Sequence, residues 1–316
     1  MKSNRVITHF VAPLEETPLL ATDAVKTDQA PLSLWADAWK KLRRRPLFIV
    51  SALLIGLIVV VALFPGLFTQ TAPNENCQLA NSDGPPAAGH PLGFTFQGCD
   101  VYARVIYGTQ ASLMVGVFSV LGVLLVGVSL GAAAGFFGGW IDTVIARLGD
   151  IFFALPLVLG ALVVTQLPFF RENKSVWTVI MVILLLAWPQ MARLTRGAVI
   201  EVRNADFITA AKSLGVSPLQ TLVRHVLPNA AAPIIVLATM ELGVFIVLEA
   251  TLSFLGIGLP GSIMSWGNDI SAAQSSIRTN PAVLLYPAAA LSLTVLSFIM
   301  LGDALRDALD PKSRQR

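Results

Sequence analysis

Charged residues are scarce in this sequence. Asp, Glu, Lys and Arg make up 13% of the 316 residues, about half of the ~25% found in a soluble globular domain. Hydrophobic residues make up 55%, and the mean hydropathy is +0.71. The composition therefore excludes an ordinary water-soluble domain and favours a membrane protein.

Sequence motifs for nucleotide and metal chemistry are missing as well. No Gly-x-x-x-x-Gly-Lys-[Ser/Thr] phosphate loop occurs, so we do not expect this chain to hydrolyse ATP. The two cysteines lack Cys-x-x-Cys spacing, and His90 is the only imidazole near them, which argues against a metal site. We predict that the chain is not an enzyme and has no catalytic residue, no metal and no cofactor of its own.

Long apolar runs are what the sequence has instead. The hydrocarbon core of a bilayer is about 30 Å thick, and a helix crosses it with about 20 apolar residues. The fold class that we predict is an all-α polytopic membrane protein with six transmembrane helices. The candidate spans are 47–66, 112–136, 143–166, 176–192, 230–255 and 282–302.

The region before the first span divides into two parts. Residues 1–31 mix Pro, Thr, Asp and Glu without periodicity, so we expect a disordered tail. Residues 32–46 place Leu32, Trp35, Trp39 and Leu42 on one helical face, followed by five Lys and Arg residues, which favours an interfacial amphipathic helix. A basic anchor without a helix of its own is the alternative.

Lys and Arg set the expected orientation. If both termini lie in the cytoplasm, 18 of the 22 Lys and Arg residues fall on the inner side. The net charge of +3 mostly records this asymmetry, so it gives no reason to expect a nucleic-acid partner. The remaining segments are predicted to be a first transmembrane helix at 47–66, an extracytoplasmic loop at 67–111, a transmembrane core at 112–302 with a cytoplasmic loop at 193–229, and a cytoplasmic C-terminal tail at 303–316.

Cys77 and Cys99 are the only cysteines, and both lie in the predicted outer loop. An even pair that faces an oxidising compartment favours a disulfide, with two free thiols as the alternative. Such a bridge would restrict the unfolded chain by about 3 kcal/mol in the chain-entropy treatment.

The predicted cytoplasmic loop contains "FITAAKSLGVSPLQTLVRHVLPN", residues 207–229. Asn204 is a candidate cap for a helix that ends near Leu214, with Asp206 near its start and Gly215 at the left-handed position after its end. Ser217 and Pro218 can start the next helix. Phe207, Ile208, Ala211 and Leu214 share one face of the first helix. This face is either a docking site or a surface that packs against the chain's own helices.

Two carboxyl groups lie within the fifth candidate span. Glu241 and Glu249 are costly there without a partner. One interpretation is that one of them lines a translocation path, and the alternative for each is a hydrogen bond between helices or a protonated carboxyl. In the second span, Gly127, Gly131 and Gly135 form a Gly-xxx-Gly-xxx-Gly face that favours close helix packing.

The loop motif is similar to a known family pattern. "TAAKSLG", followed nine residues later by "HVLP", resembles the cytoplasmic EAA loop of bacterial ABC importer permeases. Five residues match that pattern by position: Ala210, Ala211, Gly215, Leu227 and Pro228. Thr209 stands where the family has Glu, which removes an expected ion pair with the ATPase.

Four further segments extend this resemblance over nearly the whole chain beyond residue 33. They are "GCDVYARVIYGTQASLMVG" at 98–116, "GFFGGWIDTVIARLGDIFFALP" at 135–156, "LEATLSFLGIG" with "SWGNDI" within 248–270, and "MLGDALRDALDP" at 300–311. Together they resemble the second, C-type permease of the dipeptide/oligopeptide/nickel importer branch.

The resemblance implies a type I importer permease fold with an EAA-type coupling helix, in a bacterial inner membrane. The implied partners are a second homologous permease, one or two ABC ATPase subunits that use ATP and Mg, an extracytoplasmic peptide-binding protein and the lipid bilayer. The residues assigned to ATPase coupling are Asp206, Phe207, Thr209, Ala210, Ala211, Gly215, Leu227 and Pro228. The cargo would be di- or oligopeptides, and a glutamate that lines the path would meet their amino groups. Alternatives are nickel or another small solute, or a proton-coupled secondary transporter that uses Glu241 and Glu249.

Overall fold

The computed structural model describes residues 34–75 and 77–309, so the tail predicted at 1–31 lies outside it. The described residues form helices and loops, with two isolated β-bridges and no strand. The long helices are α2 (Pro46–Leu63), α3 (Val101–Phe137), α7 (Val176–Arg203), α10 (Leu227–Phe254) and α12 (Ala282–Leu309).

Shorter helices connect or cover the long ones. These are α1 (Leu34–Leu42), α4 (Gly139–Phe153), α5 (Leu157–Thr165), α6 (Pro168–Glu172), α8 (Asp206–Ser213), α9 (Pro218–Thr221) and α11 (Trp266–Ala272). Three 3₁₀ turns, η1 (Pro65–Leu67), η2 (Leu79–Asn81) and η4 (Ala273–Ser276), and one π-helical turn, η3 (Leu222–Val226), complete the described secondary structure.

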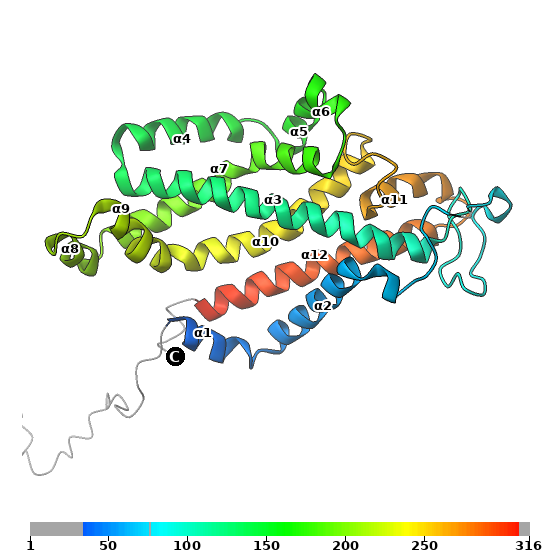
Figure 1. The fold of residues 1–316 in the computed structure, drawn as a ribbon, viewed down its shortest axis with the longest axis horizontal. Helices are drawn as coiled ribbons and strands as arrows, with labels where there is room; N and C mark the ends of the chain where they lie inside the picture. The colour runs from blue at the N-terminus through cyan, green and yellow to red at the C-terminus, as the bar shows by residue number, and fades with distance from the viewer. Residues whose placement is uncertain (1–33, 76, 310–316) are drawn as a thin grey trace, which may run out of the picture.

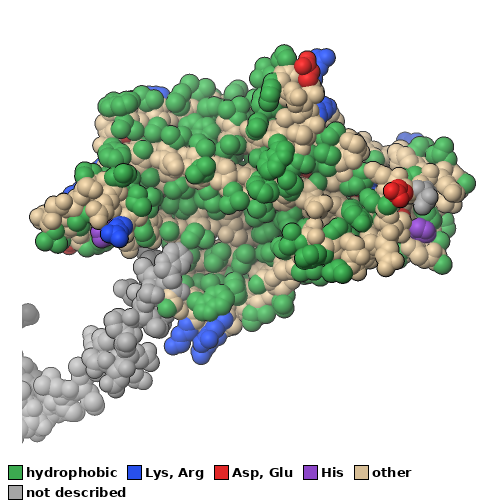
Figure 2. Space-filling view, in the orientation of Figure 1, with side chains coloured by type: hydrophobic (Ala, Val, Ile, Leu, Met, Phe, Trp, Pro, Cys, Tyr) green, Lys and Arg blue, Asp and Glu red, His purple; other side chains and the backbone are tan. Residues whose placement is uncertain are grey.

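The long helices run along the molecule and define two ends (Figure 1). The end that carries α8, α9 and α1 is called the α8 end, and the end that carries the loop between α2 and α3 is called the loop end. In Figure 2, hydrophobic side chains cover the middle of the visible face, whereas charged side chains lie at its margins. This distribution is typical of a protein surrounded by lipid.

The number of membrane spans depends on one bent pair of helices. Five described helical segments are long and apolar enough to cross a bilayer, and α4 with α5 makes a sixth if the pair is one span. Those two helices meet at 87°, so the span predicted at 143–166 is a bent pair and not one continuous helix. Pro156 causes the break, because proline disfavours helical backbone at the preceding Leu155 and has no N–H to donate.

Several predicted loops are partly helical. α3 begins at Val101 rather than at 112, since Asp100 caps it by accepting a hydrogen bond from the Tyr102 amide at 2.9 Å. α7 continues to Arg203 and the next helical run starts at Pro218, so only 204–217 separates them around α8. α12 runs to Leu309, so the described part of the tail predicted at 303–316 is helical. In each case an amphipathic or polar stretch extends an apolar helix.

The helix predicted at 32–46 is present as α1, but its packing differs from the prediction. Ala38 and Leu42 are buried against Ala304 and Ala308 of α12, while Trp39 is 59% exposed. Of the predicted stripe, Leu32 and the side chain of Trp35 lie outside the described part. α1 therefore packs on the C-terminal end of α12 through Ala38 and Leu42.

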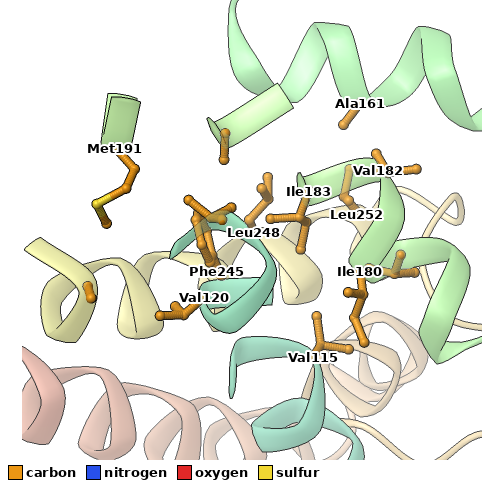
Figure 3. Packing of buried hydrophobic residues seen from close by; sticks show 14 of the residues in the cluster. Val115, Val120, Ala161, Ile180, Val182, Ile183, Met191, Phe245, Leu248 and Leu252 are labelled. Carbon is orange, nitrogen blue, oxygen red and sulfur yellow. The ribbon is translucent and has the colours of Figure 1, made fainter. Parts of the chain in front are cut away.

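The main core lies between α3, α5, α7 and α10. Val115 and Val120 of α3 meet Ile183 of α7 and Phe245 of α10 there (Figure 3). α3 packs most extensively on α7. A Cβ added at Gly127 would lie 2.7 Å from the Met191 Cβ, so the small face predicted on α3 allows this close approach.

Candidate functional site

The α8 helix protrudes at one end of the molecule and ends in a Schellman motif. The Val216 amide donates to the Ala211 carbonyl at 3.3 Å, and the Gly215 amide donates to the Lys212 carbonyl at 3.0 Å. Gly215 has φ +81°, as its predicted position after the helix requires. The backbone of this short helix is thus closed by its own loop residues.

The start of α8 differs from the prediction. Ala205 occupies the N-cap position without a side-chain hydrogen bond, and Asn204 instead ends α7. The predicted Asn204 cap is wrong because α7 continues past its apolar run to Arg203. Ser217 does cap α9, since its hydroxyl accepts from the Gln220 amide at 3.4 Å and Pro218 follows it.

The apolar side chains of α8 divide between two directions. Ile208 is fully buried in a cluster with Phe136 of α3, Val199 of α7 and Val226 of η3. The side chain of Phe207 is 49% exposed and that of Leu214 is 84% exposed. The packing alternative therefore holds for Ile208, which anchors α8 to the chain's own helices, and docking through the exposed side chains stays a prediction.

The remaining predicted coupling residues lie around this exposed side. Thr209 and Ala210 are exposed and Ala211 is half-buried. Asp206 is exposed in the first turn of α8, near the positive end of the helix dipole. A short helix with small and exposed apolar side chains suits insertion into a groove on another protein.

Electrostatic contacts tie α8 and its neighbours to the end of α3. The Arg203 Nη1 donates to the carbonyls of Gly135 and Phe136, each at 3.0 Å, and so satisfies groups that the end of α3 leaves free. The Lys212 Nζ lies 5.8 Å from the centre of the Phe136 ring. Sequence analysis did not identify Arg203 or Lys212 as contacts of α3, because both depend on tertiary structure.

Leu227 and Pro228 continue from the coupling segment into α10. The turn before them, η3, is π-helical, and the Leu227 amide donates to the Leu222 carbonyl five residues earlier. Pro228 has no amide hydrogen to donate, and the Asn229 Nδ2 donates to the His225 carbonyl at 2.7 Å. Irregular turns of this kind often occur at functional positions in helices. α9 and η3 thus run into the spanning helix α10 without an intervening loop.

Glu249 is held by three serines. It is fully buried, and its carboxylate accepts from the hydroxyls of Ser253 at 2.8 Å, Ser265 at 3.0 Å and Ser112 at 3.3 Å. The Ser112 hydroxyl also accepts from the Trp266 amide at 3.2 Å. This carboxylate therefore links α3, α10 and the start of α11, as in the helix-to-helix alternative of the sequence analysis.

Glu241 has different surroundings. It is 4% exposed and lines a cavity of about 230 Å³ together with Gln190 of α7 and Phe152 of α4. Its Oε2 has no hydrogen-bond partner in the described residues. The two glutamates thus lie eight positions apart on one helix in unlike environments.

Other polar contacts join distant elements. Arg196 of α7 binds Asp142 of α4 through two hydrogen bonds of 2.5 and 2.7 Å.

At the loop end, Cys77 and Cys99 form a disulfide in the structure. Among the described residues, no group of three or more His, Cys, Asp or Glu side chains could hold a metal ion.

Comparison with known protein families identifies the family of this chain. Residues 127–315 match the family described as the inner membrane component of binding-protein-dependent transport systems. This chain belongs to that family. Residues 33–86 also match the N-terminal transmembrane domain of oligopeptide transport permease C, which confirms the predicted C-type permease. The family match and the apolar helices together indicate a multi-pass inner-membrane protein.

Curated relatives of this permease cover most of its length. It is 37% identical to a dipeptide transport system permease of Alkalihalophilus pseudofirmus over 90% of this chain and 91% of the relative. It is 35% identical to an oligopeptide transport system permease of Bacillus subtilis, over 93% and 95% of the two chains. A glutathione transport system permease of Pectobacterium atrosepticum is 34% identical, over 93% and 96%.

A solved structure supports the fold. The inward-facing MetNI methionine ABC transporter aligns with a TM-score of 0.54 and 21% identity, covering 66% of this permease and 96% of that chain. The predicted type I importer permease fold is therefore confirmed.

Proposed function

We propose that this permease forms, with a second homologous permease, the translocation path of an ATP-driven importer for di- and oligopeptides. The names of the relatives, which include dipeptide and oligopeptide permeases, support this cargo. An extracytoplasmic binding protein delivers the peptide at the loop end, and both termini and α8 face the cytoplasm.

The observation that carries this proposal is the division of α8 into an anchored and an exposed side. Ile208 fixes α8 to α3, α7 and η3, while Phe207 and Leu214 remain on the surface. A helix attached in this way transmits displacement of a bound partner to the helices beneath it, since packed interiors move as units. The exposed side fits the groove of an ATPase subunit.

ATP hydrolysis and transport are carried out by different subunits. One or two ATPases bind ATP and Mg and hydrolyse ATP, while this chain contributes the coupling residues Asp206, Phe207, Thr209, Ala210, Ala211 and Gly215 on the exposed segment. Leu227 and Pro228 carry the motion onto α10. Thr209 stands where the family has Glu, so docking here rests on shape and apolar contact rather than on an ion pair at that position.

The test is co-purification from native membranes. Pull-down of this chain should recover a second permease and an ATPase. With Gly215→Val, the ATPase should be lost while the second permease is retained, because the change strains the left-handed end of α8 at φ +81°. Recovery of the chain without an ATPase in both forms would contradict the proposal.

The cargo is tested separately in vesicles. Uptake of labelled peptide and of labelled nickel is compared in the complete importer with the same binding protein. Peptide uptake without nickel uptake supports the proposed cargo, and the reverse would replace peptide with a metal ion.

A further inference from the structure

Two cavities lie next to each other along one face of α7 and α10. The first, of about 230 Å³, contains Gln190 of α7 and Glu241 of α10. The second, of about 750 Å³, contains Leu194 and Glu201 of α7 and Met240 of α10. Residues 190, 194 and 201 share one face of a helix, because their spacings are four and seven. The first cavity is also lined by Phe152 of α4, and the second is also lined by Phe207 of α8.

Glu241 is the carboxylate in the first cavity, and it is not used to hold the fold. Its Oε2 has no hydrogen-bond partner in the part of the chain that the structure describes. Burying a carboxylate without a partner is costly, so such groups commonly mark sites that receive a ligand or an ion. Glu249, by contrast, is fully occupied by three serine hydroxyls.

The lining of the first cavity suits a small, positively charged group at the end of a larger ligand. Apolar side chains surround Glu241, including Leu186 and Phe245, and the Gln190 amide adds a second oxygen acceptor. A primary ammonium has three donors and one positive charge, which this pair of acceptors matches. An apolar wall with few polar groups also lets the rest of a ligand pass without strong retention.

We propose that the two cavities along α7 and α10 lie on this chain's wall of the translocation path, and that Glu241 receives the primary ammonium group of the passing peptide. The inference rests on the proposed function, since it needs the second permease to close the opposite wall. It goes further by naming the face, the residue and the charged group of the cargo.

The experiment uses the complete importer, reconstituted in vesicles, with Gln190→Cys as the introduced thiol. Reductant is omitted to keep Cys77 and Cys99 paired, and importer without the new cysteine gives the background. The probes are aminoethyl methanethiosulfonate, a primary ammonium, and sulfonatoethyl methanethiosulfonate, an anion of similar size. We expect the ammonium reagent to react faster.

Adding Glu241→Gln should reduce the ratio of the two rates by at least about tenfold, because a nearby unit charge in a partly apolar site acts strongly on both reagents. Glu241→Asp keeps the charge and should keep most of the preference, which guards against an effect of misfolding. Glu249→Gln is the matched control: the same substitution on the same helix should leave the ratio unchanged.

The inference is overturned if the cysteine at 190 is unreactive in the assembled importer, or if the charge preference does not depend on Glu241. ATP-driven peptide uptake by the unmodified importer is measured in parallel. If peptide is taken up but the faster reaction of the ammonium reagent does not depend on Glu241, only the role of Glu241 is wrong. If no peptide is taken up, both the proposed function and this inference are wrong.

Discussion

The Arg104 Nε lies 2.8 Å from the Asp269 Oδ1, although 165 positions separate the two residues. Both side chains are largely buried, and the Arg104 Nη1 also donates to the Asn74 Oδ1 at 2.8 Å. This contact joins α3, α11 and the loop after α2 at the loop end. Burial raises the pKa of Asp269, and the Arg104 guanidinium opposes that rise.

Removing Arg104 should therefore destabilise the loop end. Arg104→Met leaves a buried carboxyl without its cation, and we expect a loss of about 3–5 kcal/mol in the free energy of unfolding. The measurement is the thermal unfolding midpoint of the purified chain. The double variant Arg104→Met with Asp269→Leu should recover most of the loss, and equal midpoints for the single variant and wild type would contradict the role of the pair.

The two intramembrane glutamates should respond in opposite ways to the same change. Glu249→Leu leaves three serine hydroxyls without their acceptor, at a cost of about 1–3 kcal/mol for each group that stays unsatisfied. Glu241→Leu removes an unpaired buried carboxyl and should be neutral or stabilising. Unfolding midpoints in detergent compare the two directly, and a larger loss for Glu241→Leu would refute the assignment of structural and unpaired roles.

Substitutions at two neighbouring residues of α8 should have different effects on protein stability and on ATPase binding. Ile208→Ala removes a fully buried side chain and should cost about 2–5 kcal/mol. Phe207→Ala changes a half-exposed side chain, so it should leave the unfolding midpoint nearly unchanged and weaken ATPase binding. Binding of purified ATPase to each variant provides the second readout. Unimpaired binding by Phe207→Ala would show that the exposed side of α8 is not the docking surface.

The sequence was sufficient for five spanning helices, because their apolar runs are long enough to cross a bilayer, whereas the sixth predicted span is the bent pair α4 and α5. It was also sufficient for the end of α8, where only a few residue types suit the left-handed backbone at Gly215. The helix ends were less predictable. Polar residues such as Arg104 and Arg203 extend helices beyond their apolar runs by pairing with groups far away in the sequence.

The candidate site was predictable in position but not in geometry. Motif spacing predicted the position of α8, yet the anchoring of Ile208 depends on a cluster with α3, α7 and η3. The different surroundings of Glu241 and Glu249 could not be predicted either, because they depend on serines and cavities contributed by other helices.

The disulfide at the loop end should stabilise the folded chain. Cys77 and Cys99 are 22 positions apart, and reducing the bridge should cost about 3 kcal/mol of unfolding free energy in the chain-entropy treatment. Unfolding midpoints with and without reductant test this, with Cys77→Ser/Cys99→Ser as the control that reductant should not affect. Complete thiol labelling of the untreated native chain would show that the bridge does not form.

The central claim is that this permease moves its cargo only when an ATPase acts through α8. The most direct measurement is peptide uptake into vesicles that contain this chain, the second permease, the ATPases and the binding protein. We predict uptake that requires ATP, is lost with Gly215→Val and is retained with Gly197→Val, a helical glycine that also has open space around it. Uptake by this chain alone, driven by a pH gradient without ATP, would contradict the account.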